Sequence, residues 1–180
     1  MRSLAVFSPE DYTLATIGAL TLASTRPTAL IVDLDSRQTR WCEGRSLRYL
    51  VDEGPTGVDL SPVRSGIALL GNGGVEPHEA DEVLDALIGG WDSVVLVLPG
   101  DIDVPVPVVP IRPHAHPSLL VPFTRPAVYV RAGWGGSTAT PGPLVRAPSS
   151  AAVHRLMNGG LPAPGRWVRD WSAVWDIPWQ

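Results

Sequence analysis

The first thirty-five residues alternate between apolar runs and a helix-forming segment, and this alternation restricts the fold more than any other feature of the sequence. Residues 4–7 and 29–32 are short apolar runs that predict buried strands, while residues 14–23 are rich in Ala and Leu and predict a helix. Asp33 and Asp35 follow the second run, as polar residues often do at the carboxyl edge of a parallel sheet. Strand, helix and strand form one βαβ unit, so we expect an α/β fold with a mostly parallel sheet flanked by helices.

Similar patterns predict the elements that follow. Apolar residues at helical spacing indicate helices over residues 45–53 and 77–88, and apolar runs indicate strands over residues 67–70, 93–98 and 127–131. We interpret residues 54–62 as a loop and the glycine-rich segment 133–137 as a turn. The whole chain, residues 1–180, is expected to form a single domain whose βαβ core covers residues 1–100.

A proline-rich segment covers residues 101–126, with prolines at positions 105, 107, 110, 113, 117, 122 and 126. Such a density of prolines is incompatible with a regular helix or a central strand. We therefore expect residues 104–109 to form at most an edge strand or an extended packed segment. The remaining residues, 127–180, are expected to supply a strand, a loop and a C-terminal helix rich in tryptophan.

Composition excludes several classes of function. No run approaches the ~18 apolar residues of a membrane-spanning helix, and we expect a cytoplasmic protein. The single cysteine, Cys42, cannot form an internal disulfide. The net charge of −4 gives no general attraction for nucleic acid. The arginines are scattered, apart from a small group formed by Arg37, Arg40, Arg45 and Arg48.

Residues 7–23 keep the frame of a nucleotide-binding strand, loop and helix without its phosphate-binding residues. Residues 8–23, SPEDYTLATIGALTLA, resemble the opening of the ParA/MinD-like ATPases with a deviant P-loop, including the pilus-localisation branch called CpaE or TadZ. Thr16 matches the family, but Glu10 stands in place of its signature lysine, and Asp11 and Tyr12 in place of two glycines. Leu14 replaces a third glycine and Ala15 replaces the P-loop lysine.

The resemblance extends to about residue 100. Residues 30–35, LIVDLD, are similar to the second strand of the family with its magnesium-side aspartates. Residues 66–73 resemble the third strand and its loop, and residues 91–99, WDSVVLVLP, resemble the Walker B strand with Val97 in place of its aspartate. Because the chain is shorter than a complete domain of this family, the resemblance implies a reduced P-loop NTPase-like sheet.

These substitutions predict a protein without ATPase activity. A P-loop binds phosphate through inward-facing backbone N–H groups and a lysine, whereas Glu10 and Asp11 would repel a triphosphate. We therefore expect no cofactor and no metal. The resemblance implies a pseudo-ATPase that acts as an adaptor or positioning factor for pilus or secretion machinery or for division-site placement, reaching the inner face of the membrane through a protein partner such as an intact ATPase.

A different class of function stays open. Carboxylates at a strand-end edge can hold a metal or a small molecule, and Thr16, Asp33 and Asp35 are the residues that would do so here, with His114 or Cys42 near them. His114 and His116 have a spacing that metal sites sometimes use, but further ligands are missing nearby. We interpret them as loop histidines.

Four tryptophans recur every fourth residue near the C-terminus, at Trp167, Trp171, Trp175 and Trp179. On a helix this spacing aligns the indoles along one face, although Pro178 places Trp179 beyond the last turn. The stripe is either core that packs on the sheet or a docking face for a partner. Together with the four arginines at positions 37–48, it supplies the candidate partner-binding residues.

Overall fold

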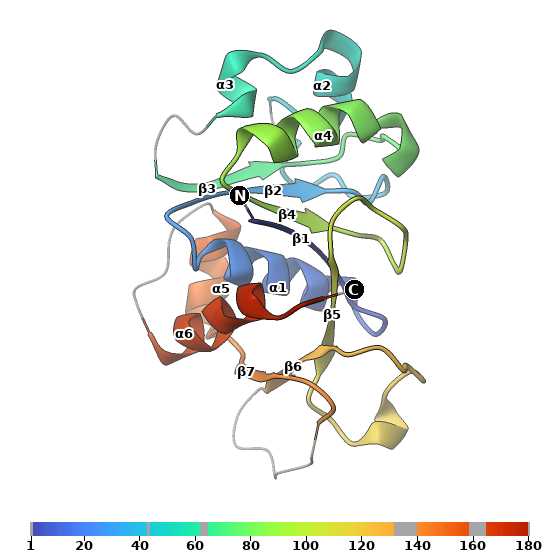
Figure 1. The fold of residues 1–180 in the computed structure, drawn as a ribbon, viewed down its shortest axis with the longest axis vertical. Helices are drawn as coiled ribbons and strands as arrows, with labels where there is room; N and C mark the ends of the chain where they lie inside the picture. Colours follow the sequence, from blue (N-terminus) through green and yellow to red (C-terminus); the bar gives the residue numbers. More distant parts are fainter. Residues whose placement is uncertain (1, 43, 62–64, 132–139, 159–164, 180) are drawn as a thin grey trace.

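The structure is a computed structural model that describes residues 2–42, 44–61, 65–131, 140–158 and 165–179. A seven-stranded sheet runs through the molecule in the order β3-β2-β4-β1-β5-β6-β7 (Figure 1). Every pair of neighbouring strands is parallel. The strands are β1 (Arg2–Phe7), β2 (Thr28–Asp33), β3 (Gly66–Leu70), β4 (Ser93–Val97), β5 (Val108–Pro113), β6 (Val128–Arg131) and β7 (Leu144–Arg146).

Helices cover both faces of the sheet (Figure 1). On one face lie α1 (Tyr12–Ala23), α5 (Ser150–Met157) and α6 (Arg166–Ser172), the last continued by the 3₁₀ turn η3 (Ala173–Asp176). On the other face lie α2 (Leu47–Glu53), α3 (Gly57–Leu60) and α4 (Asp81–Gly90), the last preceded by η1 (Pro77–Glu79). The short turn η2 (Pro117–Leu119) lies between β5 and β6. The expected α/β class is confirmed.

Successive residues of the strands β1 to β5 alternate between two separate cores. In β2, Ala29 and Ile31 pack toward α1, whereas Leu30 and Val32 pack toward α2 and α4. A parallel sheet covered on both faces needs apolar residues at every position, which explains why the strands read as continuous apolar runs. The first helix is also deeply buried, with eight of the twelve residues of α1 inaccessible to solvent.

The predicted elements of the first hundred residues are observed, with shifted ends. The strands β1 to β4 coincide with the four apolar runs, and the helix predicted over residues 77–88 is the turn η1 followed by α4. The segment interpreted as a loop, residues 54–62, contains the one-turn helix α3. The prediction missed β7 and α5. The strand β7 has only three residues and lies between Pro143 and Pro148, so it gives no periodic signal.

The prediction for the proline-rich segment was wrong. Residues 108–113 form β5, which is an interior strand between β1 and β6. The prolines are tolerated because β5 changes partner along its length: Pro110 is the last residue that pairs with β1, and Ile111 is the first that pairs with β6. Pro110, which has no N–H to donate, therefore lies where the β1–β5 pairing ends and the β5–β6 pairing begins. The loss of one backbone hydrogen bond disrupts the sheet least at this position.

Candidate functional site

The connection between β1 and α1 is a four-residue loop, residues 8–11, whose backbone N–H groups bond to its own side chains. The Ser8 hydroxyl accepts hydrogen bonds from the N–H groups of Glu10 (3.3 Å) and Asp11 (3.2 Å). Asp11 caps α1, and its Oδ1 accepts from the Thr13 N–H at 2.8 Å. In a phosphate-binding loop such N–H groups face the ligand. Here the N–H groups of Glu10, Asp11 and Thr13 are already bonded to side-chain oxygens of the protein.

The helix begins earlier than a P-loop of the aligned length allows. α1 starts at Tyr12, so Ala15 and Thr16, the positions that the sequence resemblance compares with a P-loop lysine and hydroxyl residue, lie inside the helix and are buried. The Thr16 hydroxyl donates to the Tyr12 carbonyl at 3.1 Å. The segment that would encircle a phosphate is thus shortened to the four loop residues.

Glu10 is held by an ion pair that sequence analysis did not find. Arg112 of β5 is only 4% exposed and donates through Nε at 2.9 Å and through Nη2 to Glu10 Oε1. The same guanidinium donates to the Val121 carbonyl and lies 5.3 Å from the Phe123 ring. The hydrogen bond to Glu10 raises the pKa of Arg112. The pair fixes the loop against the interior strand β5.

Asp33, at the carboxyl end of β2, is completely buried. Its Oδ1 accepts hydrogen bonds from the Tyr12 hydroxyl and from the Asp35 N–H at 3.0 Å. Its Oδ2 lies 3.5 Å from Arg40 Nε, an ion-pair distance, without a hydrogen-bond partner among the described residues. Desolvation raises the pKa of Asp33 against the opposing effect of the Tyr12 hydrogen bond, and it raises the pKa of Tyr12 as well.

Arg40 packs against the cluster formed by Tyr12, Thr16 and Asp33 and contacts all three side chains. Its Nη1 donates to the Thr16 hydroxyl at 2.7 Å, and its guanidinium lies 4.8 Å above the Tyr12 ring. The neighbouring carboxylate, Asp35, is neutralised separately by Arg37, whose Nε and Nη2 contact both oxygens at 2.8 and 2.9 Å. The Arg37 hydrogen bonds lower the pKa of Asp35. The structure therefore brings the predicted residues Tyr12, Thr16 and Asp33 together, but their polar atoms face one another and Arg40.

The four arginines of positions 37–48 do not form a free basic surface. Besides the Arg37 and Arg40 pairs, Arg45 Nη1 lies 2.8 Å from Asp59 Oδ1. Arg48 lies 3.6 Å from Asp52 and 3.5 Å from Glu79. Each arginine thus has an acidic neighbour, which offsets its charge toward any anionic partner.

The histidines and the cysteine do not join the Asp33 cluster. His116 Nδ1 lies 2.8 Å from the Ser118 hydroxyl, and the His114 N–H donates to the Val130 carbonyl of β6. The Cys42 thiol donates to the Arg40 carbonyl at 3.4 Å. Among the described residues, no group of three or more His, Cys, Asp or Glu side chains could hold a metal ion. The glycine-rich segment 133–137 lies outside the described residues.

The tryptophan stripe divides into two buried and two partly buried rings. Trp171 is fully buried, and its Nε1 donates to the Arg146 carbonyl of β7 at 2.9 Å. Trp175 is 6% exposed, and its Nε1 donates to the Thr25 hydroxyl at 2.9 Å. Both rings pack against the core beneath α1, whereas Trp167 and Trp179 pack at its margin. Trp179 lies beyond the last turn, as its neighbour Pro178 predicts.

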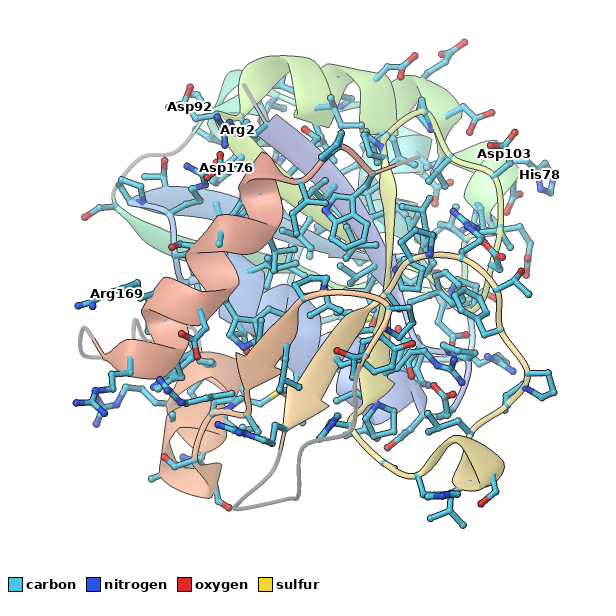
Figure 2. The ribbon with its side chains drawn as sticks, turned by 60° about the horizontal axis from the view of Figure 1, so that its bottom comes forward. Arg2, His78, Asp92, Asp103, Arg169 and Asp176 are labelled. Carbon is cyan, nitrogen blue, oxygen red and sulfur yellow. The ribbon has the colours of Figure 1, made fainter. Side chains whose placement is uncertain are left out.

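The outer side of α6 carries exposed charge. Arg166 and Arg169 line a hollow of about 410 Å³ together with Thr25, Gly165, Val168 and Ser172. Neither arginine forms an ion pair with another described residue. Figure 2 shows Arg169 on the opposite side of the molecule from His78 and Asp103. This surface therefore presents two arginines without an ion-pair partner among the described residues.

Taken together, the fold and the site define an α/β protein whose first strand–loop–helix unit is closed by its own side chains. Comparisons with protein-family models, with curated proteins and with solved structures find no match. In the described parts of the chain, no helix has the length and apolar character needed to cross a membrane.

Proposed function

We propose that this chain is a ParA/MinD-like pseudo-ATPase that acts as a protein adaptor or positioning factor. The observation that carries the proposal is the β1–α1 loop, in which Ser8 and Asp11 occupy the backbone N–H groups that a phosphate would need. A nucleotide would have to displace these bonds and also enter beside the carboxylates of Glu10 and Asp11.

The residues at the carboxyl ends of β4 and β2 also support a protein without ATPase activity. Val97, which replaces the Walker B aspartate in the resemblance, is fully buried at the end of β4 and pairs with Asp33. Asp33 itself is engaged by Tyr12 and Arg40. The residues that would handle magnesium and water in an active relative are thus apolar or already paired.

An adaptor needs a surface, and the outer side of α6 is the one we assign to this role. Trp and Arg are enriched at the energetic centres of protein interfaces. Arg166 and Arg169 line the hollow on this side, and the partly buried Trp167 is the next residue in the chain after Arg166. Residues 127–180 carry five arginines and two acidic residues, a net charge of +3, whereas residues 1–126 carry nine arginines and sixteen acidic residues, a net charge of −7. This polarity suits a partner with an acidic face.

The setting follows from the resemblance. The partner would be a component of pilus or secretion machinery, or of division-site placement, and an intact ATPase is a partner of the right kind. The protein would work in the cytoplasm and reach the inner face of the membrane through that partner.

Affinity capture from the native host, with the protein tagged and its partners quantified by mass spectrometry, tests this proposal. Reversing the α6 charges with Arg166→Glu and Arg169→Glu should remove the specific partner, irrespective of added ATP. The matched control reverses two arginines outside α6, Arg125→Glu and Arg155→Glu, with the same change in net charge. Loss of the partner in the control but not in the α6 variant, or capture that requires ATP, would contradict the proposal.

A further inference from the structure

Two points on the sheet are topologically suited to ligand binding. In open α/β sheets, ligands bind outside the carboxyl ends of neighbouring strands whose connections leave in opposite directions. In the order β3-β2-β4-β1-β5-β6-β7, β1 leads toward β2 and its neighbour β5 leads toward β6. In the same way β2 leads toward β3, whereas its neighbour β4 leads toward β5. The connections therefore diverge at β1/β5 and at β2/β4.

The β1/β5 point is filled by protein. The Glu10–Arg112 pair lies there, and Phe123 packs edge-to-face on Phe7 with ring centroids 6.0 Å apart. Arg112 also binds the Val121 carbonyl, which ties the segment after η2 across this point. A ligand has no room at this position without displacing a buried ion pair.

The β2/β4 point is open. A hollow of about 340 Å³ lies there, formed by the segments that follow β2, β3 and β4. Its apolar floor consists of Leu34 and Leu84, both buried, with Ile102 and Val104 on one side. Pro77 and Pro105 also line the hollow. The shape of the hollow is therefore fixed by buried core residues and by two prolines, whose rings restrict the backbone.

The polar lining of the hollow has one sign of charge. Asp81 and Asp103 lie on its rim with His78, and Asp85 continues the rim along α4. Figure 2 shows His78 and Asp103 at the same edge of the molecule. Among the described residues, no arginine lines the hollow and the three aspartates form no ion pair.

We propose that this hollow is a binding site for a small organic cation, an amine or guanidine that carries an aliphatic or aromatic body. The apolar floor takes the body of the ligand, and Asp81 and Asp103 take its charge. The volume lies at the lower end of the ~300–1,000 Å³ typical of small-molecule pockets, which limits the ligand to a small molecule. The site lies on the face of the sheet opposite α1, so it does not depend on the state of the β1–α1 loop.

The test is a nuclear magnetic resonance titration of the ¹⁵N-labelled protein with three probes of equal chain length, hexylamine, hexanol and hexanoate. We expect saturable shifts with hexylamine at the amides of residues 34, 78–85 and 102–105, with a dissociation constant of about 1 mM or below. Asp81→Asn with Asp103→Asn should weaken hexylamine about fivefold to tenfold. The control variant, Asp52→Asn with Glu53→Gln, removes two exposed carboxylates of α2 and should leave the affinity unchanged.

Several results would overturn the proposal. Equal shifts with hexanol or hexanoate would show that charge is not recognised. Shifts that stay linear in hexylamine, or that spread over all acidic surfaces, would show only non-specific attraction. Unchanged affinity in the Asp81 and Asp103 variant, with spectra that show an intact fold, would exclude this hollow as the site.

Discussion

Replacing Trp171 by alanine tests whether the tryptophan stripe is core or interface. The indole is fully buried between α6, α1 and β7, and its Nε1 bonds to the Arg146 carbonyl. The packing around it is close: a Cβ built on Gly18 of α1 would lie 3.5 Å from the ring and 2.1 Å from the Ile111 side chain. Neighbouring side chains this tightly placed cannot fill the space that a truncated tryptophan leaves.

The expected loss of stability is large. Truncating a buried Trp to Ala costs about 3–5 kcal/mol in unfolding free energy, and the stranded Arg146 carbonyl adds about 1–3 kcal/mol. For a chain of this length, each kcal/mol shifts the melting temperature by about 2–4 °C, so the cavity alone lowers it by roughly 6–20 °C. Chemical denaturation followed by fluorescence and by circular dichroism measures the change.

The matched control is Trp167→Ala, at the start of the same helix. Its ring packs at the margin of the core, so we expect a loss of about 1 kcal/mol, well below that of Trp171→Ala. The reasoning would be refuted if Trp171→Ala unfolded cooperatively within about 1 kcal/mol of the wild type. In that case the ring would be available to a partner.

Three further substitutions examine the Glu10–Arg112 pair and Asp33. Arg112→Met leaves the Glu10 carboxylate without its buried partner, so it should lower the unfolding free energy by about 3–5 kcal/mol. Adding Glu10→Gln to this variant should restore most of the lost stability. A double variant as unstable as Arg112→Met alone would contradict the prediction. Burial raises the pKa of Asp33 in the folded protein, so ionisation of this carboxyl group opposes folding. As the pH rises above about 4 toward the folded-state pKa, the unfolding free energy of the wild type should therefore fall relative to that of Asp33→Asn. Parallel urea titrations between about pH 4 and pH 8 measure the difference, and a constant difference would contradict the prediction.

Local patterns were sufficient to predict the first half of the fold. The apolar runs and the segment rich in Ala and Leu are themselves the elements they specify, so β1, α1, β2 and β4 could be located without a structure, although the Asp11 cap and the start of α1 at Tyr12 were not predicted. The second half of the fold depends on pairing between strands that are far apart in the sequence. β5 is interior although it contains Pro110, because its partner changes from β1 to β6 at that residue, and no local pattern encodes this change.

The site shows the same limit. Glu10 was identified as a replacement for a lysine and Asp33 as a candidate ligand, but their partners depend on tertiary structure: Arg112 lies 102 residues from Glu10, and Tyr12 lies 21 residues from Asp33. The four-residue spacing of the tryptophans predicted a shared helical face without saying whether α1 or solvent covers it. The hollow at β2/β4 combines three separate segments, so no contiguous motif marks it.

Calorimetric titration of ATP and of ADP with magnesium into the purified protein tests the central claim, that the β1–α1 loop has no place for a phosphate. We expect no heat of binding up to millimolar nucleotide. Binding tighter than about 100 μM, roughly −5.5 kcal/mol, would mean that the loop opens and gives up its bonds to Ser8 and Asp11, and it would contradict the account.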